Sequence, residues 1–236
     1  MEIEYIFRFS KGRIEQFNLQ FDDEDLSLQS GLGEVSEEPW MVLSNHQCKG
    51  CSLDQQTSPL CPVAANLGGM IRPFKEEISH TEVEVEVLFR ERKISKCCDL
   101  QQGIRSMMGL VMATSGCPLL DKLRPMAYLH QPFSTMDETL FRSVSSYLMA
   151  QFLHPSDNQQ HNFDLEGVRQ LFNDITLTNE SFALRIQSIG GRDANINALL
   201  GLDIAVKIGG MSVDSDWLEK VKPLFSGFIR REVQAP

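Results

Sequence analysis

Residues 45–67 read NHQCKGCSLDQQTSPLCPVAANL and contain three of the six cysteines of the chain, Cys48, Cys51 and Cys61. A histidine, His46, stands two places before the first of them. Thiolates and imidazoles gathered in a short segment are typical of metal sites, whereas a hydrophobic core does not require them. We therefore expect this segment to bind a metal ion and the rest of the chain to be organised around it.

A tetrahedral metal site needs a fourth ligand in addition to these three cysteines. The Cys48-x2-Cys51 spacing folds the chain back so that two sulfurs face one point, and Cys61 follows after a loop short enough to close easily. We favour Cys117 as the fourth ligand, because it lies at a predicted helix break beside Gly116, where the backbone can approach closely. His46 is the alternative, either as a ligand or as a hydrogen-bond donor to a cysteine sulfur.

Zinc is the metal that we expect, because cysteine loops with this spacing commonly bind it. An iron–sulfur cluster is the alternative, since Cys61 and Cys117 are each followed by proline, as in a common ferredoxin ligand run. A third interpretation is that these residues are small buried thiols or a redox loop without a metal. The adjacent pair Cys97 and Cys98 is predicted to be one buried and one partly exposed thiol, outside the site.

The composition is that of an ordinary globular protein. The 236 residues are 42% hydrophobic and 23% charged, with a formal net charge of −10. This acidic balance argues against nucleic acid or an anionic membrane as a partner, and a protein partner is compatible with it. The N-terminus shows no signal peptide and no apolar run is long enough to cross a membrane, so we expect a cytoplasmic protein with reduced thiols.

The first part of the chain carries strand patterns. Residues 4–9 and 13–21 are rich in aromatic and β-branched residues and are separated by Ser10-Lys11-Gly12, which predicts a hairpin. Residues 22–39 are interpreted as a surface loop and 40–44 as a short strand. In residues 81–94 valines alternate with glutamates, which predicts a strand with one buried face.

Helical patterns dominate the second part of the chain. A capping box formed by Thr135 and Glu138 marks one helix start. The predicted helices cover residues 62–67 (ended by Gly68-Gly69), 100–114, 119–130, 135–153, 165–173, 194–208 and 215–231, with a loop at 157–162. The predicted fold class is α+β: a small antiparallel sheet with a cysteine-rich metal loop (residues 1–95), followed by a mostly helical part (residues 96–236) that packs on it as one unit.

A second candidate site involves Arg124, Tyr128 and His130, which precede the predicted helix start at Thr135. Together they could form a pocket for an anion next to a helix N-terminus. The plainer interpretation is that they cap helices and form hydrogen bonds between them. The sequence contains no nucleophile elbow, so no catalytic residue is assigned.

Four motifs together resemble an uncharacterised bacterial family known as a domain of unknown function. They are His46-x-Cys48-x2-Cys51, Cys61-Pro62-x3-Asn66-Leu67, Met112-Ala113-Thr114-Ser115-Gly116-Cys117-Pro118 and Leu123-Arg124-Pro125-Met126. The resemblance covers most of the chain. It implies a bacterial, cytoplasmic protein and suggests that Cys117 belongs with the first three cysteines, but it implies no activity.

The function that we expect is therefore that of a metal-binding protein with structural zinc and an interaction or regulatory role. One alternative is an iron–sulfur protein that acts in redox chemistry or as a sensor. Another is an enzyme that acts on an anionic small molecule near Arg124 and His130. The composition predicts no particular oligomeric state.

Overall fold

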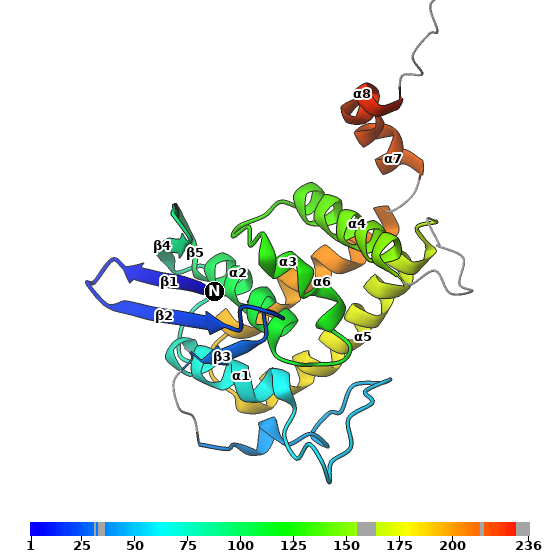
Figure 1. The fold of residues 1–236 in the computed structure, drawn as a ribbon. Coiled ribbons are helices and arrows are strands. Elements are labelled where there is room, and N and C mark those ends of the chain that lie inside the picture. Colours follow the sequence, from blue (N-terminus) through cyan, green and yellow to red (C-terminus); the bar gives the residue numbers. More distant parts are fainter. Residues whose placement is uncertain (31, 33–35, 155–163, 213–214, 230–236) are drawn as a thin grey trace, which may run out of the picture.

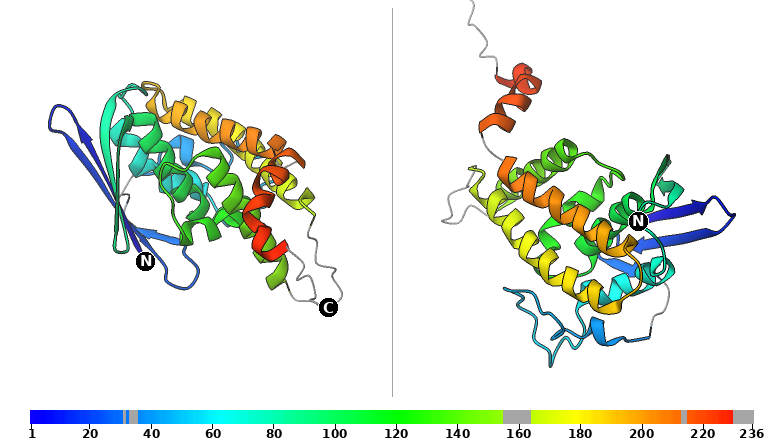
Figure 2. Two further views of the ribbon diagram at one scale, coloured as in Figure 1. Left: turned by 90° about the horizontal axis from the view of Figure 1, so that it is seen from above. Right: turned by 180° about the vertical axis from the view of Figure 1, so that it is seen from behind.

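The computed structural model describes residues 1–30, 32, 36–154, 164–212 and 215–229. These residues form an α+β fold, as predicted, in which one antiparallel sheet of five strands has the order β3-β2-β1-β4-β5 (Figure 1). The helices lie on one side of this sheet, as the view from above shows (Figure 2). The strands are β1 (Glu2–Phe9), β2 (Ile14–Phe21), β3 (Leu28–Ser30), β4 (Glu82–Phe89) and β5 (Arg92–Asp99).

The N-terminal hairpin is confirmed: β1 and β2 pair in antiparallel register, with Tyr5 opposite Phe17. The turn contains Gly12 at φ +82°, a conformation that glycine adopts without strain. The alternating segment at 81–94 is a strand only as far as Phe89. The chain then turns at Arg90 and returns as β5, which runs through residue 95 to Asp99.

The prediction of a strand at residues 40–44 is wrong. This segment begins with a 3₁₀ helix, η1 (Pro39–Met41), and then makes a single bridge between Val42 and Leu60. The backbone carbonyls of Trp40, Val42 and Leu43 accept hydrogen bonds from the guanidinium of Arg185, at 2.7–2.8 Å. A side chain from a distant helix thus occupies acceptors that a neighbouring strand would have used. The predicted loop at 22–39 includes the short strand β3.

Two helices have the predicted bounds. Helix α2 (Leu100–Thr114) buries Ile104, Met107, Met108 and Val111 completely. Helix α4 (Met136–Leu153) begins with the predicted capping box, in which the Glu138 amide donates to Thr135 Oγ1 at 3.3 Å and the Thr135 amide donates to Glu138 Oε2 at 2.7 Å. The far end of its apolar stripe is not core, because Phe152 is 72% exposed.

The other helices differ from their predicted lengths. Gly68-Gly69 does not end the first one, since α1 continues to Ile71. The predicted helix at 119–130 is replaced by two short turns, and α5 is much longer than residues 165–173. The observed elements are α1 (Pro62–Ile71), η2 (Arg72–Phe74), η3 (Asp121–Leu123), α3 (Pro125–Tyr128), α5 (Glu166–Ile189), α6 (Ala194–Ser212), α7 (Ser215–Val221), η4 (Lys222–Phe225) and α8 (Ser226–Ile229).

One hydrophobic core joins the sheet to the helices. The inward side chains of β1 and β4 pack with α1, α2 and the long helices α5 and α6, which run side by side (Figures 1 and 2). The predicted loop at 157–162 lies outside the described residues. None of the described helices has the length and apolar character needed to span a membrane.

The closest approach of α2 to the sheet generates a test of this packing. A Cβ atom at Gly103 would lie 2.7 Å from Phe7 Cε1 and 2.8 Å from Val85 Cγ2. We expect Gly103→Ala to lower the free energy of unfolding by about 1–3 kcal/mol through overpacking.

Gly109→Ala, in the same helix, is the control, because a Cβ atom there would meet only Leu202, at 3.4 Å. This control should leave stability unchanged or raise it by up to about 1 kcal/mol through helix propensity. Urea unfolding of both variants measures the difference, and equal stabilities would contradict the described contact.

Candidate metal centre

The loop that carries Cys48 and Cys51 is closed at its neck by backbone hydrogen bonds. The Leu43 amide donates to Pro59 O and the Cys61 amide donates to Met41 O, both at 2.8 Å. Within the loop, the Cys51 amide donates to Cys48 O at 3.0 Å, and Gly50 has φ +88°. The Cys-x2-Cys segment is therefore a tight turn.

Cys61 and Cys117 lie at helix ends. Cys61 is the N-cap residue of α1 and its carbonyl accepts the Ala65 amide at 2.9 Å. Cys117 follows the end of α2, after Gly116 at φ +77°, and its carbonyl accepts the amides of Leu120 and Asp121. Both side chains are 6% exposed. The fold thus fixes the backbone of each of these two cysteines.

The four cysteines predicted as ligands lie in one neighbourhood. Burial and, to a smaller extent, proximity to Cys61, Cys117 and Cys51 together raise the pKa of the Cys48 thiol to about 11. Burial also raises the pKa of Cys117, and the amides of Leu120 and Leu119 oppose that shift. Within the described residues, however, no three His, Cys, Asp or Glu side chains are arranged so that one ion could contact all of them. The cysteines are near one another, but their sulfurs do not surround a common point.

The remaining cysteines lie on β5, and His46 lies in the loop two residues before Cys48. Cys97 is exposed and Cys98 is buried on β5, as predicted for that pair. The His46 side chain is exposed, and its backbone has φ +48°. All six cysteines are free thiols.

A buried arginine that the sequence analysis did not identify lies next to the cysteines. Arg185 of α5 is completely buried. Its Nη1 donates to Trp40 O at 2.8 Å and Val42 O at 2.7 Å, and its Nη2 donates to Leu43 O at 2.7 Å. Its Nε has no hydrogen-bond partner, and no carboxylate in the described part of the chain forms an ion pair with it. The positive charge of Arg185 lowers the pKa of Cys48, which places the guanidinium and the thiol group in the same electrostatic environment.

The sequence did contain a signal for this arginine. Phe182 and Ile186 are three residues before and one residue after Arg185, and both are buried on the inner face of α5. A cation inside an apolar helical stripe needs a partner, because burying an unpaired charge is strongly unfavourable. The hydrophobic period of α5 therefore marks Arg185 as a residue with a structural or functional role.

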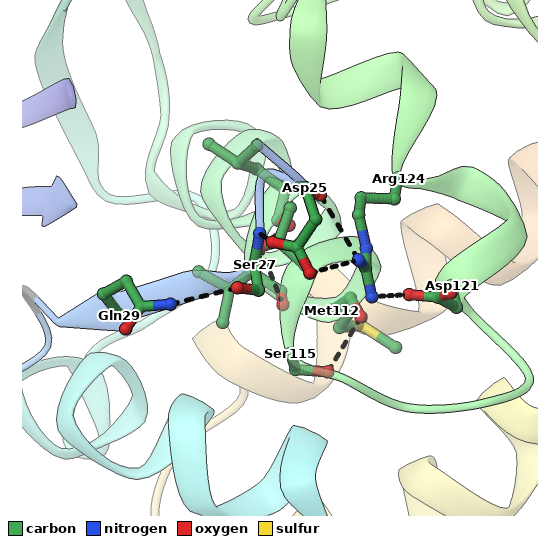
Figure 3. Close-up of polar contacts among 10 residues, drawn as sticks. Asp25, Ser27, Gln29, Met112, Ser115, Asp121 and Arg124 are labelled. Carbon is green, nitrogen blue, oxygen red and sulfur yellow. Dashed lines mark hydrogen bonds and ion pairs between the residues drawn. The ribbon is translucent and has the colours of Figure 1, made fainter. Parts of the chain in front are cut away.

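The second predicted group, Arg124, Tyr128 and His130, does not line one pocket. Arg124 donates to the carboxylate of Asp25 at 3.0 Å and also pairs with Asp121, so it joins the β2–β3 loop to η3 (Figure 3). Tyr128 is 56% exposed, and its ring lies under the guanidinium of Arg90, 4.8 Å from the ring centroid. These contacts are structural.

His130 belongs to a partly buried polar cluster with Tyr5 and Ser106. Its Nε2 lies 2.6 Å from the hydroxyl of Tyr5, which lies 2.9 Å from Ser106 Oγ. Burial and the positive charge of Arg142 lower the pKa of His130 to about 3, and burial raises the pKa of Tyr5. His130 is therefore a neutral hydrogen-bonding group that connects the segment after α3 to β1 and α2.

Comparison with known proteins identifies a family but no activity. The model of the family described as a domain of unknown function (DUF6901) matches residues 3–226, and the chain belongs to this family. This confirms the expectation of an uncharacterised family. No curated protein and no solved structure matches the chain.

The contacts of Arg185 generate a stability prediction. Arg185→Gln removes a buried guanidinium that donates to three backbone carbonyls, of which Trp40 O and Leu43 O are buried. We therefore expect the free energy of unfolding to fall by about 3–5 kcal/mol. Arg169→Gln on the same helix, where the side chain is 43% exposed and pairs with the exposed carboxylate of Glu166, should change it by less than about 1 kcal/mol. Chemical unfolding of both variants measures these changes. Similar losses of unfolding free energy in the two variants would show that the buried contacts of Arg185 contribute no more to stability than the ion pair of Arg169.

The low pKa of His130 predicts a pH effect. Between about pH 3 and pH 6.5 the unfolded chain binds a proton at His130 that the folded chain does not, so its contribution to stability is present above pH 6.5 and lost as the pH falls. We expect wild-type protein to lose up to about 2 kcal/mol more than His130→Gln between about pH 7 and pH 5. Urea unfolding at both pH values measures this difference. An identical pH dependence for the two proteins would refute it.

Proposed function

We propose that this member of the DUF6901 family is a bacterial, cytoplasmic metal-binding protein in which Cys48, Cys51, Cys61 and Cys117 together bind one zinc ion. The observation that supports the proposal is the proximity of four cysteines from three separate segments to one another and to the buried Arg185. Other thiols of the chain, Cys97 and Cys98, lie on β5 outside this group. Four thiolates are a common ligand set of structural zinc.

The charge of the arginine suits this centre. Zinc bound by four thiolates carries a net charge of two negative units, and a buried anion of that kind is stabilised by a nearby cation. Arg185 has no carboxylate in an ion pair within the described residues. A zinc–thiolate centre would supply the missing negative charge, which accounts for the retention of a fully buried guanidinium among apolar side chains.

Metal binding requires the sulfurs to move together until each lies about 2.3 Å from the ion. Cys48 and Cys51 lie in a loop with glycine at the turn, and their side chains are only partly buried, so rotation of these two side chains is the easier movement. Binding would then fasten the 40–61 loop and the start of α1 to the end of α2. In this way the metal would hold the sheet-bearing part and the helical part together.

A site with four protein ligands leaves no open position for a substrate, which is typical of structural rather than catalytic zinc. The proposed role is therefore interaction or regulation, with the metal maintaining the fold. An iron–sulfur cluster could use the same four cysteines and carry the same charge of two negative units in its common oxidised state, and it would make the protein a redox or sensor protein.

Elemental analysis and an ultraviolet–visible spectrum of anaerobically purified wild-type protein test the proposal. We expect one equivalent of zinc and no visible absorption band. Cys117→Ser should lose the metal and lower Tm by roughly 10 °C or more, because structural metal binding contributes directly to folding free energy.

Two controls separate metal binding from burial of a thiol. Cys98→Ser changes an equally buried thiol outside the group and should retain zinc even if Tm falls. Cys97→Ser changes an exposed thiol and should leave both zinc content and Tm unchanged. Iron and sulfide together with a visible absorption band would show that the centre is an iron–sulfur cluster and not zinc. Absence of any metal, or full zinc content in Cys117→Ser, would overturn the proposed centre.

A further inference from the structure

A second feature of the fold is a cavity of about 500 Å³, lined by residues of β5, α2, η3, α3 and the segment after it, α4, α5 and α6. Part of its wall is apolar, with Leu110, Met126, Phe172 and Ile175. This size lies within the range of small-molecule sites, which combine apolar walls with a few polar groups. The cavity is separate from the four cysteines, which do not line it.

The charged residues that line the cavity are all cations: Lys96, Arg105 and Arg142. Its described lining includes no Asp or Glu, although the chain has 32 acidic and 22 basic residues. Within the described part of the chain, none of the three cations forms an ion pair with a carboxylate. An acidic protein thus has a cavity whose formal charges are only positive.

Arg142 shows why its charge is left without a carboxylate. Glu138 is one turn before it on α4, but its carboxylate accepts the amide and hydroxyl of Thr135 and the side-chain amide of Gln131. Arg142 instead donates to Ser134 Oγ at 2.9 Å and to the carbonyl of Leu129 at 3.5 Å. Its Nε is buried and has no hydrogen-bond partner in the structure. The capping box therefore keeps the Glu138 carboxylate out of a direct ion pair with Arg142, although its charge still raises the pKa of the arginine against the effect of burial.

The other two cations are also held toward the cavity. Lys96 Nζ lies 5.7 Å from the centroid of the Phe133 ring. Phe133 precedes Ser134, the residue whose hydroxyl accepts a hydrogen bond from Arg142. On the opposite wall, α6 presents Gly201 to Arg105. A Cβ atom there would lie 2.6 Å from Arg105 Nη1, so the missing side chain leaves room for the guanidinium.

We propose that this cavity binds an organic anion with an apolar body and one carboxylate or phosphate group. The anionic group pairs with Arg105, Arg142 and Lys96, and the apolar body contacts the Met126, Phe172 and Ile175 wall. Arginine suits this role because its planar fork of N–H donors matches carboxylate and phosphate oxygens. This binding function does not depend on the metal centre and would add a ligand to its proposed structural role.

Isothermal titration calorimetry on the full-length protein tests the proposal with decanoate and decyl phosphate as probes. Decanol has the same tail without a charge, and inorganic phosphate has a charge without a tail. We expect saturable one-to-one binding of at least one of the two amphiphilic anions, roughly tenfold or more tighter than either control compound, since a charge-assisted hydrogen bond adds to apolar burial. The preferred probe identifies the anionic group.

Substitutions locate the binding. Arg105→Gln and Arg142→Gln should each weaken binding roughly tenfold or more. The Arg105 guanidinium forms no hydrogen bond with the described residues, so its loss should disturb folding less than the loss of Arg142. Lys11→Gln removes one positive charge from the exposed hairpin turn and should bind like the wild type. Circular dichroism confirms folding of each variant, and Arg105→Gln keeps the test valid if Arg142→Gln unfolds. The proposal is overturned by no binding of either anion up to about 1 mM, by decanol binding equally well, or by wild-type affinity in folded Arg105→Gln.

Discussion

The hydrogen bonds of the Arg185 guanidinium to three backbone carbonyls are the interaction on which much of this structure depends. They join α5 to the segment Trp40–Leu43, which forms the neck of the cysteine loop. Without them, the buried carbonyls of Trp40 and Leu43 would lose their donor, whereas Val42 O would keep the Asn45 amide at 3.0 Å. An unpaired buried polar group is costly. The same side chain brings a positive charge to the cysteines. One residue therefore both holds the neck of the loop and partly opposes the rise in the pKa of Cys48 that burial causes.

The distribution of charge inside the molecule differs from that of the chain as a whole. The formal net charge is −10, yet Arg185 beside the cysteines and Arg142 at the cavity both lie without a carboxylate in an ion pair among the described residues. Buried cations persist only when another group compensates for lost hydration. At Arg185, backbone carbonyls do this in part, and the proposed thiolate centre would complete it. At Arg142, a hydroxyl and a carbonyl contribute, and the proposed organic anion would add the missing charge.

Local sequence patterns predicted the elements whose structure depends on neighbours in the chain. The β1–β2 hairpin, the bounds of α2 and the capping box of α4 all agree with the structure. The errors occurred where tertiary contacts prevail over local preference. Gly68-Gly69 did not end α1, and residues 40–44 did not form a strand, because Arg185 occupies their carbonyls.

The sequence by itself determined the α+β class, the acidic surface and the turn that places Cys48 near Cys51, because each follows from composition or from spacing along a few residues. Only the tertiary structure decided that Arg185 would meet residues more than 140 positions away and that Arg105 and Arg142 would face one cavity. It also gave Arg124, Tyr128 and His130 different partners: Asp25, Arg90 and Tyr5. Such meetings depend on how helices pack against the sheet, and hydrophobic periodicity specifies which face of a helix is buried but not which distant residue it contacts.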